Sequence, residues 1–122
     1  LDSCGPMPDL PVAVTTFQGT RADPSLRGSF RNISEDNFTP VHFIQSILHG
    51  MAEELFSFYQ AYLDQGGSVP SLLVGSGNAL RRNLHLRRVF EQRFSCKLIM
   101  SENEEEAACG AAIFALNCSS PK

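Results

Sequence analysis

The segment Gly75-Ser76-Gly77-Asn78 is the sharpest chemical feature of the sequence, because it stands between a short apolar run and a segment of helical character. Glycines at such a junction let a phosphate or a ribose approach the backbone, and the free N–H groups with the dipole of the following helix favour an anion. The pattern is not a dinucleotide fingerprint, since Leu80 stands at the third glycine position, and no Gly-Lys-Ser/Thr follows. Spacing alone therefore leaves two readings open, a nucleotide-binding turn and a turn that needs glycine only for its geometry.

A second candidate is the segment 19–28, in which Thr20, Arg21, Asp23 and Arg27 stand on a long polar stretch. Arginine and threonine side chains can hold a phosphorylated ligand. Long loops in small domains are usually functional or disordered. A solvated loop with an Arg–Asp pair is the simpler alternative.

The remaining charged runs have ordinary structural explanations. Glutamates at 102, 104, 105 and 106 stand where the start of a helix favours negative charge, so we predict neither a metal site nor a catalytic residue among them. Arginines at 81, 82, 87 and 88 read as a solvated helix face, although Arg81 or Arg82 could lie near a nucleotide phosphate.

Strands and helices alternate along the chain. We predict a lead-in loop over 1–11, a strand over 12–17 and a polar loop over 20–37. A helix of about 25 residues then begins at Thr39-Pro40, with threonine as the N-cap and proline at the first helical position, and ends at Gly66-Gly67. Its apolar stripe should form the core, and it consists of Ile44, Ile47, Leu48, Met51, Leu55, Tyr59 and Tyr62.

The second half of the chain predicts a buried strand over 72–74, a helix over 79–94, a strand over 97–100 and a last helix. The last helix should begin with a capping box formed by Ser101 and Glu104. The inner side of the helix over 79–94 is predicted from Leu80, Leu84, Val89, Phe90 and Phe94. The sum is an α/β fold of order β-α-β-α-β-α, in which three parallel strands form one sheet.

Composition narrows the class of protein. The 122 residues carry a net charge of −3, and no basic patch suits a nucleic-acid backbone. No apolar run approaches the roughly 20 residues that span a bilayer. The four cysteines form no C-x-x-C pair, which favours free thiols in a cytoplasmic protein. Three N-x-[ST] sequons, at Asn32, Asn37 and Asn117, leave a secreted glycoprotein domain as a minor alternative.

Three segments in register resemble the C-terminal part of the FGGY family of carbohydrate kinases. The first is the G-x-R…R-G loop from Gly19 to Gly28, and the second is the glycine turn, where Ser76 replaces the usual middle glycine. The third is an E-x-x-A-x-G-A-A helix, which runs here from Glu105 to Ala112. The match extends from about residue 12 to 117. Within the family the turn, followed by Arg82-Asn83, is most similar to the sedoheptulokinases.

The resemblance implies a partial actin-like (ribonuclease H-like) ATPase domain. Residues 1–122 would form the C-terminal portion of the second, nucleotide-side domain. The implied reaction is ATP-dependent phosphorylation of a sugar hydroxyl, with sedoheptulose as substrate. Nucleotide contacts would come from Gly75, Ser76, Gly77 and Asn78, with Asn83 near the adenine, and phosphate-side contacts from Thr20, Arg21 and Arg27.

The family's catalytic general base, its sugar-binding residues and most ligands of Mg²⁺ would lie in a preceding part of the same kinase. The absence of an initiator methionine supports this expectation. The 122 residues alone should then form part of an ATP site without turnover. A non-catalytic interaction module, binding a partner through an uncovered sheet edge and the Ala/Gly helix, remains the alternative function.

Overall fold

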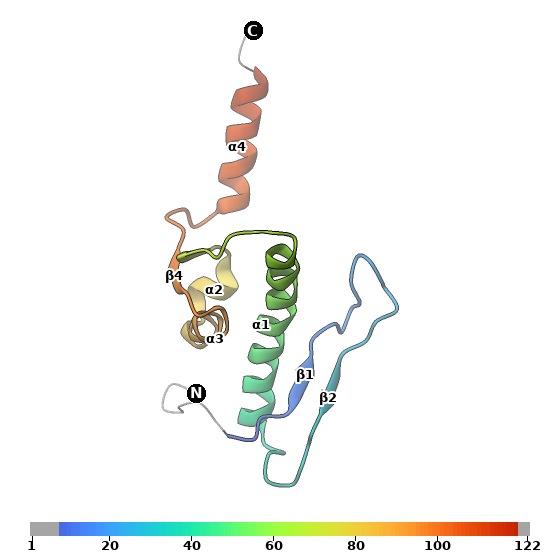
Figure 1. Ribbon diagram of the computed structural model, residues 1–122. Helices are drawn as coiled ribbons and strands as arrows, with labels where there is room; N and C mark the ends of the chain where they lie inside the picture. Colours follow the sequence, from blue (N-terminus) through green and yellow to red (C-terminus); the bar gives the residue numbers. More distant parts are fainter. Residues whose placement is uncertain (1–7, 120–122) are drawn as a thin grey trace.

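The computed structural model of the chain describes residues 8–119, and Figure 1 shows how its elements are arranged. Of the predicted lead-in loop, residues 1–7 lie outside this range, while 8–11 contain no helix or strand, as predicted. In chain order the elements are β1 (Val12–Val14), β2 (Ser29–Arg31), α1 (Pro40–Asp64), β3 (Leu72–Gly75), α2 (Asn78–Arg82), α3 (Leu84–Phe94), β4 (Lys97–Met100) and α4 (Glu106–Ser119).

The described strands form two separate pairs instead of one parallel sheet. β1 pairs with β2 in antiparallel fashion, with Ala13 opposite Phe30, whereas β3 pairs with β4 in parallel, with Val74 opposite Ile99. The predicted three-stranded parallel sheet and the strict β-α-β-α-β-α order are therefore wrong. The prediction missed β2 because three residues with a single apolar member, inside a polar stretch, give too short an alternation to recognise.

Helix α1 begins and ends where the sequence predicts. The Oγ1 of Thr39 accepts a hydrogen bond from the backbone N–H of His42. Pro40 lies in the first turn, where backbone N–H groups have no partner within the helix, so its lack of an N–H costs no helical hydrogen bond. At the other end Gly66 has a φ of +92°, a conformation that glycine adopts without steric cost. Local capping residues therefore determine the length of this helix.

The core lies between α1 and α3. Its buried residues are Leu48 and Ala52 from α1 with Leu86 and Phe90 from α3. The predicted core stripe of α1 is largely wrong, since most of its other members are half exposed or nearly so. The reason is that α3 and β1, which both pack against α1, leave most of this stripe uncovered. The exposed members and their exposed fractions are Ile44 at 44%, Met51 at 36%, Leu55 at 51% and Tyr62 at 51%.

The predicted helix over 79–94 is broken at Asn83. This residue has extended backbone angles (φ −119°, ψ 96°), and its Oδ1 accepts a hydrogen bond from the N–H of Leu86, so it caps α3. The break changes the helical phase after residue 83. As a consequence Leu84, predicted to face inward, is 49% exposed, while Leu86 is 3% exposed.

Helix α4 stands away from the other helices in Figure 1, and none of its residues is buried. It begins at Glu106, so the predicted capping box of Ser101 and Glu104 is wrong. The Oγ of Ser101 instead donates to the carboxylate of Glu106. Within residues 8–119 we find no helix with the length and apolar character needed to cross a bilayer.

We expect Leu86→Ala to lower the free energy of unfolding by about 2–5 kcal/mol, because it opens a cavity between α1 and α3. Leu84→Ala is the matched control on the same helix, and it should cost about 0.5 kcal/mol or less, since that side chain is half exposed. Urea unfolding followed by circular dichroism measures both. Equal losses would contradict this placement of the core.

Candidate functional site

The glycine turn follows β3 at the point where the parallel pair ends. Gly75 is buried, and its carbonyl accepts a hydrogen bond of 2.8 Å from the N–H of Ser101, which extends the pairing beyond β4. A Cβ at Gly75 would lie 3.2–3.3 Å from atoms of Leu98, Met100 and Leu80. A side chain at this position would crowd these three neighbours, so glycine lets them pack closely against the backbone of the turn.

Gly77 has a different reason to be glycine. Its φ is +91°, a region that favours glycine, and a Cβ there would meet no atom within 4 Å. The backbone is thus open to an approaching group. The neighbouring side chains of Ser76 and Asn78 are exposed, and neither makes a hydrogen bond with another described residue. Of the predicted nucleotide contacts, residues 76–78 therefore lie at the surface, whereas Gly75 is buried beneath them.

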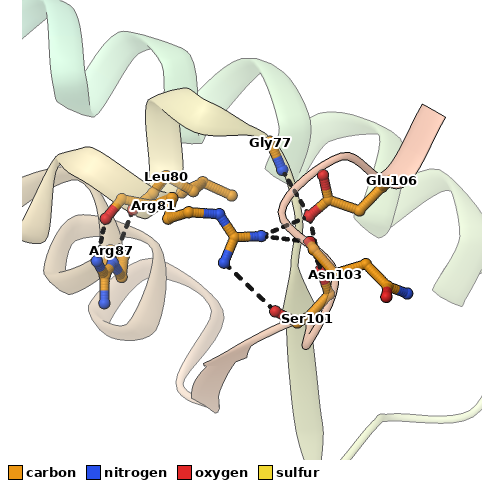
Figure 2. A network of polar contacts seen from close by, with 7 residues as sticks. All are labelled: Gly77, Leu80, Arg81, Arg87, Ser101, Asn103 and Glu106. Carbon is orange, nitrogen blue, oxygen red and sulfur yellow. Dashed lines mark hydrogen bonds and ion pairs between the residues drawn. The ribbon is translucent and has the colours of Figure 1, made fainter. Parts of the chain in front are cut away.

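A carboxylate reaches this turn from the start of α4 (Figure 2). The Oε1 of Glu106 accepts hydrogen bonds from the N–H of Gly77 at 3.3 Å, from Nη2 of Arg81 at 2.8 Å and from Oγ of Ser101 at 2.6 Å. One oxygen atom therefore joins the turn, α2 and the segment after β4. The Arg81–Glu106 ion pair is partly shielded, with side chains 24% and 28% exposed.

Arg81 is fixed by more than this ion pair. Its Nη2 donates to the carbonyl of Asn103 at 2.6 Å, and its Nη1 donates to the carbonyl of Ser101 at 3.4 Å. Arg87 of α3 binds the carbonyls of α2. Its Nε donates to the carbonyl of Leu80 at 2.7 Å, and its Nη2 donates to the carbonyl of Arg81. The sequence predicts that the arginines at 81, 82, 87 and 88 form a solvated helix face. Two of them, Arg81 and Arg87, instead donate hydrogen bonds to backbone carbonyls of neighbouring segments.

The hydrogen bonds lower the pKa of Glu106 to about 2. The hydroxyl of Ser101 has the largest effect, followed by the backbone N–H groups of Glu106 and Gly77 and by the charge of Arg81, while partial burial opposes them. The carboxylate is therefore ionised at neutral pH, and a negative charge stands beside the glycine turn.

Asn83, predicted to lie near the adenine, has its Oδ1 engaged in capping α3. This leaves its amide nitrogen as the group available for a ligand. The predicted phosphate-side loop lies elsewhere. In Figure 1 the connection between β1 and β2 and the turn after β3 lie on opposite sides of α1, so the structure does not bring Thr20, Arg21 and Arg27 to the glycine turn.

The 19–28 loop is folded on itself. The N–H of Asp23 donates to Oγ1 of Thr20, and Nη1 of Arg27 donates to the carbonyls of Pro24, Ser25 and Leu26 at 2.9–3.2 Å. The hydroxyl of Ser25, with its backbone N–H, lowers the pKa of the Asp23 carboxyl. The Arg–Asp pair considered from the sequence is not formed.

Arg21 is exposed and makes no hydrogen bond or ion pair with another described residue. Of the two arginines predicted on this loop, it is therefore the one whose guanidinium can accept a ligand. Thr20 uses its hydroxyl within the loop.

A cavity of about 400 Å³ lies between the lead-in to β1 and α1, and Leu10, Ala13, Ser46, His49 and Glu53 are among its lining residues. Burial lowers the pKa of His49, and the charge of Glu53 opposes this shift. None of the predicted nucleotide-site residues lines this cavity, so it is separate from the glycine turn.

Sequence reasoning missed the role of Glu106. It was counted with its neighbours as part of a helix start, because a run of four glutamates over 102–106 gives no sign of which carboxylate turns inward. The motif gives no signal either, because Glu106 stands at an unspecified position of the E-x-x-A-x-G-A-A segment, directly after its glutamate. Among residues 8–119 no three histidine, cysteine, aspartate or glutamate side chains come together in a way that could hold a metal ion.

In the comparison with known families, residues 6–117 match the model of the C-terminal domain of the FGGY family of carbohydrate kinases. The match covers nearly the whole sequence, and the chain belongs to this family. Its members are phosphotransferases that act on sugars, and the domain implies an actin-like ATPase fold. No curated protein matches the chain.

The lowered pKa of Glu106 predicts how its contribution to stability depends on pH. Because the carboxyl has a pKa of about 2 in the folded chain and an ordinary value of 4.5, its contribution is fully present above pH 4.5 and is lost as the pH falls toward 2. We expect the difference in unfolding free energy between wild type and Glu106→Gln to shrink over this interval, as measured by urea unfolding. Glu104→Gln, which changes the same charge on an exposed side chain, should show no such trend. A difference that stays constant from pH 4.5 to 2 would contradict the hydrogen-bonded geometry.

Proposed function

We propose that the chain forms the nucleotide-side wall of the active site of an ATP-dependent sugar kinase. The observation that carries the proposal is the open backbone of Gly77 at the end of the parallel pair, in a chain that belongs to the FGGY family. A ribose or a phosphate can approach this backbone from the side where a Cβ would stand, because no atom lies within 4 Å there. The family generally uses ATP with Mg²⁺.

Within this proposal, the nucleotide contacts are Gly75, Ser76, Gly77 and Asn78. Gly75 shapes the turn, the N–H of Gly77 faces the ligand, and the exposed side chains of Ser76 and Asn78 supply polar groups beside it. Asn83 contributes through its amide nitrogen, near the adenine.

The phosphate-side role of Thr20, Arg21 and Arg27 is a separate part of the proposal. Arg21 is the candidate for direct contact, because its guanidinium is free of other described residues, whereas Thr20 and Arg27 shape the loop that carries it. Since this loop and the glycine turn lie on opposite sides of α1, we propose that the loop contacts a different part of the ligands from the turn.

The proposed reaction transfers the terminal phosphoryl group of ATP to a hydroxyl of sedoheptulose. The similarity of the segment from Gly75 to Asn83 to the sedoheptulokinases supports this choice of sugar. The general base, the sugar-binding residues and the ligands of Mg²⁺ are proposed to come from the rest of the kinase, because the family model that matches is that of the C-terminal domain alone. The proposed location is the cytoplasm.

One of the three sequons is closed to a glycan in the folded chain. Asn37, in the second sequon, is fully buried, and its side chain accepts from the N–H of Ser34 and donates to the carbonyls of Asp9 and Asn32. Its amide nitrogen is thus unavailable for a glycan in the folded chain. Asn117, in the third sequon, lies within α4.

ATP binding at the turn can be tested with two glycines of matched geometry. Gly77→Leu and Gly66→Leu both place a side chain at a φ near +90° with open space around it, so each should incur a backbone strain of about 1–3 kcal/mol. We expect Gly77→Leu to weaken ATP binding about tenfold or more, corresponding to a loss of about 1.4 kcal/mol of binding free energy. Gly66→Leu should leave the affinity unchanged.

Isothermal titration of the chain with ATP measures both affinities. Equal effects of the two substitutions would show that strain, and not occupation of the turn, changes the affinity. Such a result would remove the basis for placing the nucleotide at Gly77.

A further expectation follows from the proposal that this chain supplies only nucleotide contacts and that the rest of the kinase supplies the general base. The 122-residue chain should bind ATP without phosphorylating sedoheptulose, and the whole kinase that contains it should release ADP only when the sugar is added. A coupled assay of ADP formation measures both. Sugar phosphorylation by the 122 residues alone would show that this chain contains its own general base.

A further inference from the structure

The carboxylate of Glu106 has the contacts of a bound anion. Its Oε1 accepts a backbone N–H from Gly77, a guanidinium N–H from Arg81 and a hydroxyl from Ser101 (Figure 2). Three donors converging on one oxygen from three segments is the arrangement by which proteins also hold a phosphate oxygen.

These donors are held in place without help from the carboxylate. The guanidinium of Arg81 is anchored on the carbonyls of Ser101 and Asn103, and Ser101 itself is fixed through its N–H on Gly75. The N–H of Gly77 is set by the backbone of the turn. If Glu106 left, the donors would stay together, and the hydroxyl of Ser101 could turn to the carbonyl of Asn103 at 3.2 Å. The N–H of Gly77 and one N–H of Arg81 Nη2 would lack an acceptor, which is costly for partly shielded polar groups.

The site also has a donor that the carboxylate does not use. The Nε of Arg81 is buried and has no hydrogen-bond partner among the described residues. A carboxylate has two oxygens, whereas a terminal or bridging phosphate group of a nucleotide offers more acceptor atoms to the same guanidinium.

Glu106 itself can move at small cost in packing. It is the first residue of α4, a helix with no buried residue that stands away from the other helices in Figure 1. Its displacement breaks hydrogen bonds and an ion pair but opens no cavity in the core between α1 and α3.

We propose that the N–H of Gly77, the guanidinium of Arg81 and the hydroxyl of Ser101 form a phosphate-binding site, and that Glu106 occupies it as an internal anion when no ligand is bound. This inference rests on the proposed function, because it places a phosphate of the nucleotide at these donors. It adds Arg81 and Ser101 to the proposed ligand-binding residues. An incoming phosphate displaces the carboxylate, since two negative groups cannot share the donors.

The first test is titration with ATP and with adenosine, which lacks phosphates. Glu106→Gln removes the competing charge at nearly constant shape, so ATP should bind about tenfold tighter than to wild type, while adenosine binding should not change. Glu104→Gln, a charge-matched change on the exposed residue two positions earlier, should leave both affinities as they are. ATP affinity that is unchanged or weaker in Glu106→Gln would overturn the inference and would leave nucleotide binding at the turn intact.

A second arm separates this inference from the proposed function. If neither ATP nor adenosine binds any variant, the proposed function fails, and inorganic pyrophosphate then tests the anion site alone. We expect pyrophosphate to shift the ¹⁵N–¹H resonance of the Gly77 amide at about tenfold lower concentration in Glu106→Gln than in wild type. No saturable shift at Gly77 in either protein would overturn the inference.

The role of Arg81 is tested in the Glu106→Gln background. Adding Arg81→Gln should abolish the gain in pyrophosphate affinity, whereas Arg82→Gln, on the exposed neighbour with no described contact, should keep most of it. Circular dichroism of both double variants establishes whether they are folded to the same extent. Equal losses from the two arginine changes would indicate a general effect of charge and would contradict a specific site at Arg81.

Discussion

The convergence of three donors on Oε1 of Glu106 is the interaction that fixes the start of α4 against the glycine turn. It joins the end of the parallel strand pair, the short helix α2 and the start of α4, three segments that share little packing otherwise. The apolar core reaches this region through the partly buried side chains of Leu80 and Leu98, which lie beside Gly75. The position of Glu106 at the turn is instead determined by polar contacts, and it responds to charge more readily than a packed core would.

Local signals predicted those features of the fold that local chemistry determines. Thr39, Pro40 and Gly66 fixed the ends of α1 because caps and φ preferences act within a few residues. The pairing of β1 with β2 and the break at Asn83 were not predictable in the same way. A three-residue strand carries no measurable alternation, and Asn83 has a helical alternative that only the cap on Leu86 displaces.

In the candidate site, too, the features that depend on local sequence were predictable and those that depend on distant contacts were not. Its glycines were recognisable, because a turn after a strand requires them and because the order of three motifs indicated the FGGY family, which residues 6–117 match. The inward orientation of Glu106 and the anchoring of Arg81 depend on contacts between residues 20 or more positions apart, such as Arg81 with Asn103. Sequence spacing does not reveal such contacts, so the charged groups of the site became visible only in the structure.

We propose that the chain holds ATP through the backbone of the glycine turn. A crystal structure of the chain with a non-hydrolysable ATP analogue and Mg²⁺ tests this directly. We expect an oxygen of the analogue within hydrogen-bond distance of the Gly77 nitrogen, with the carboxylate of Glu106 withdrawn from it. An analogue bound at the cavity beside His49, or one that leaves the Glu106–Gly77 contact in place, would show that the turn does not hold the nucleotide in this way.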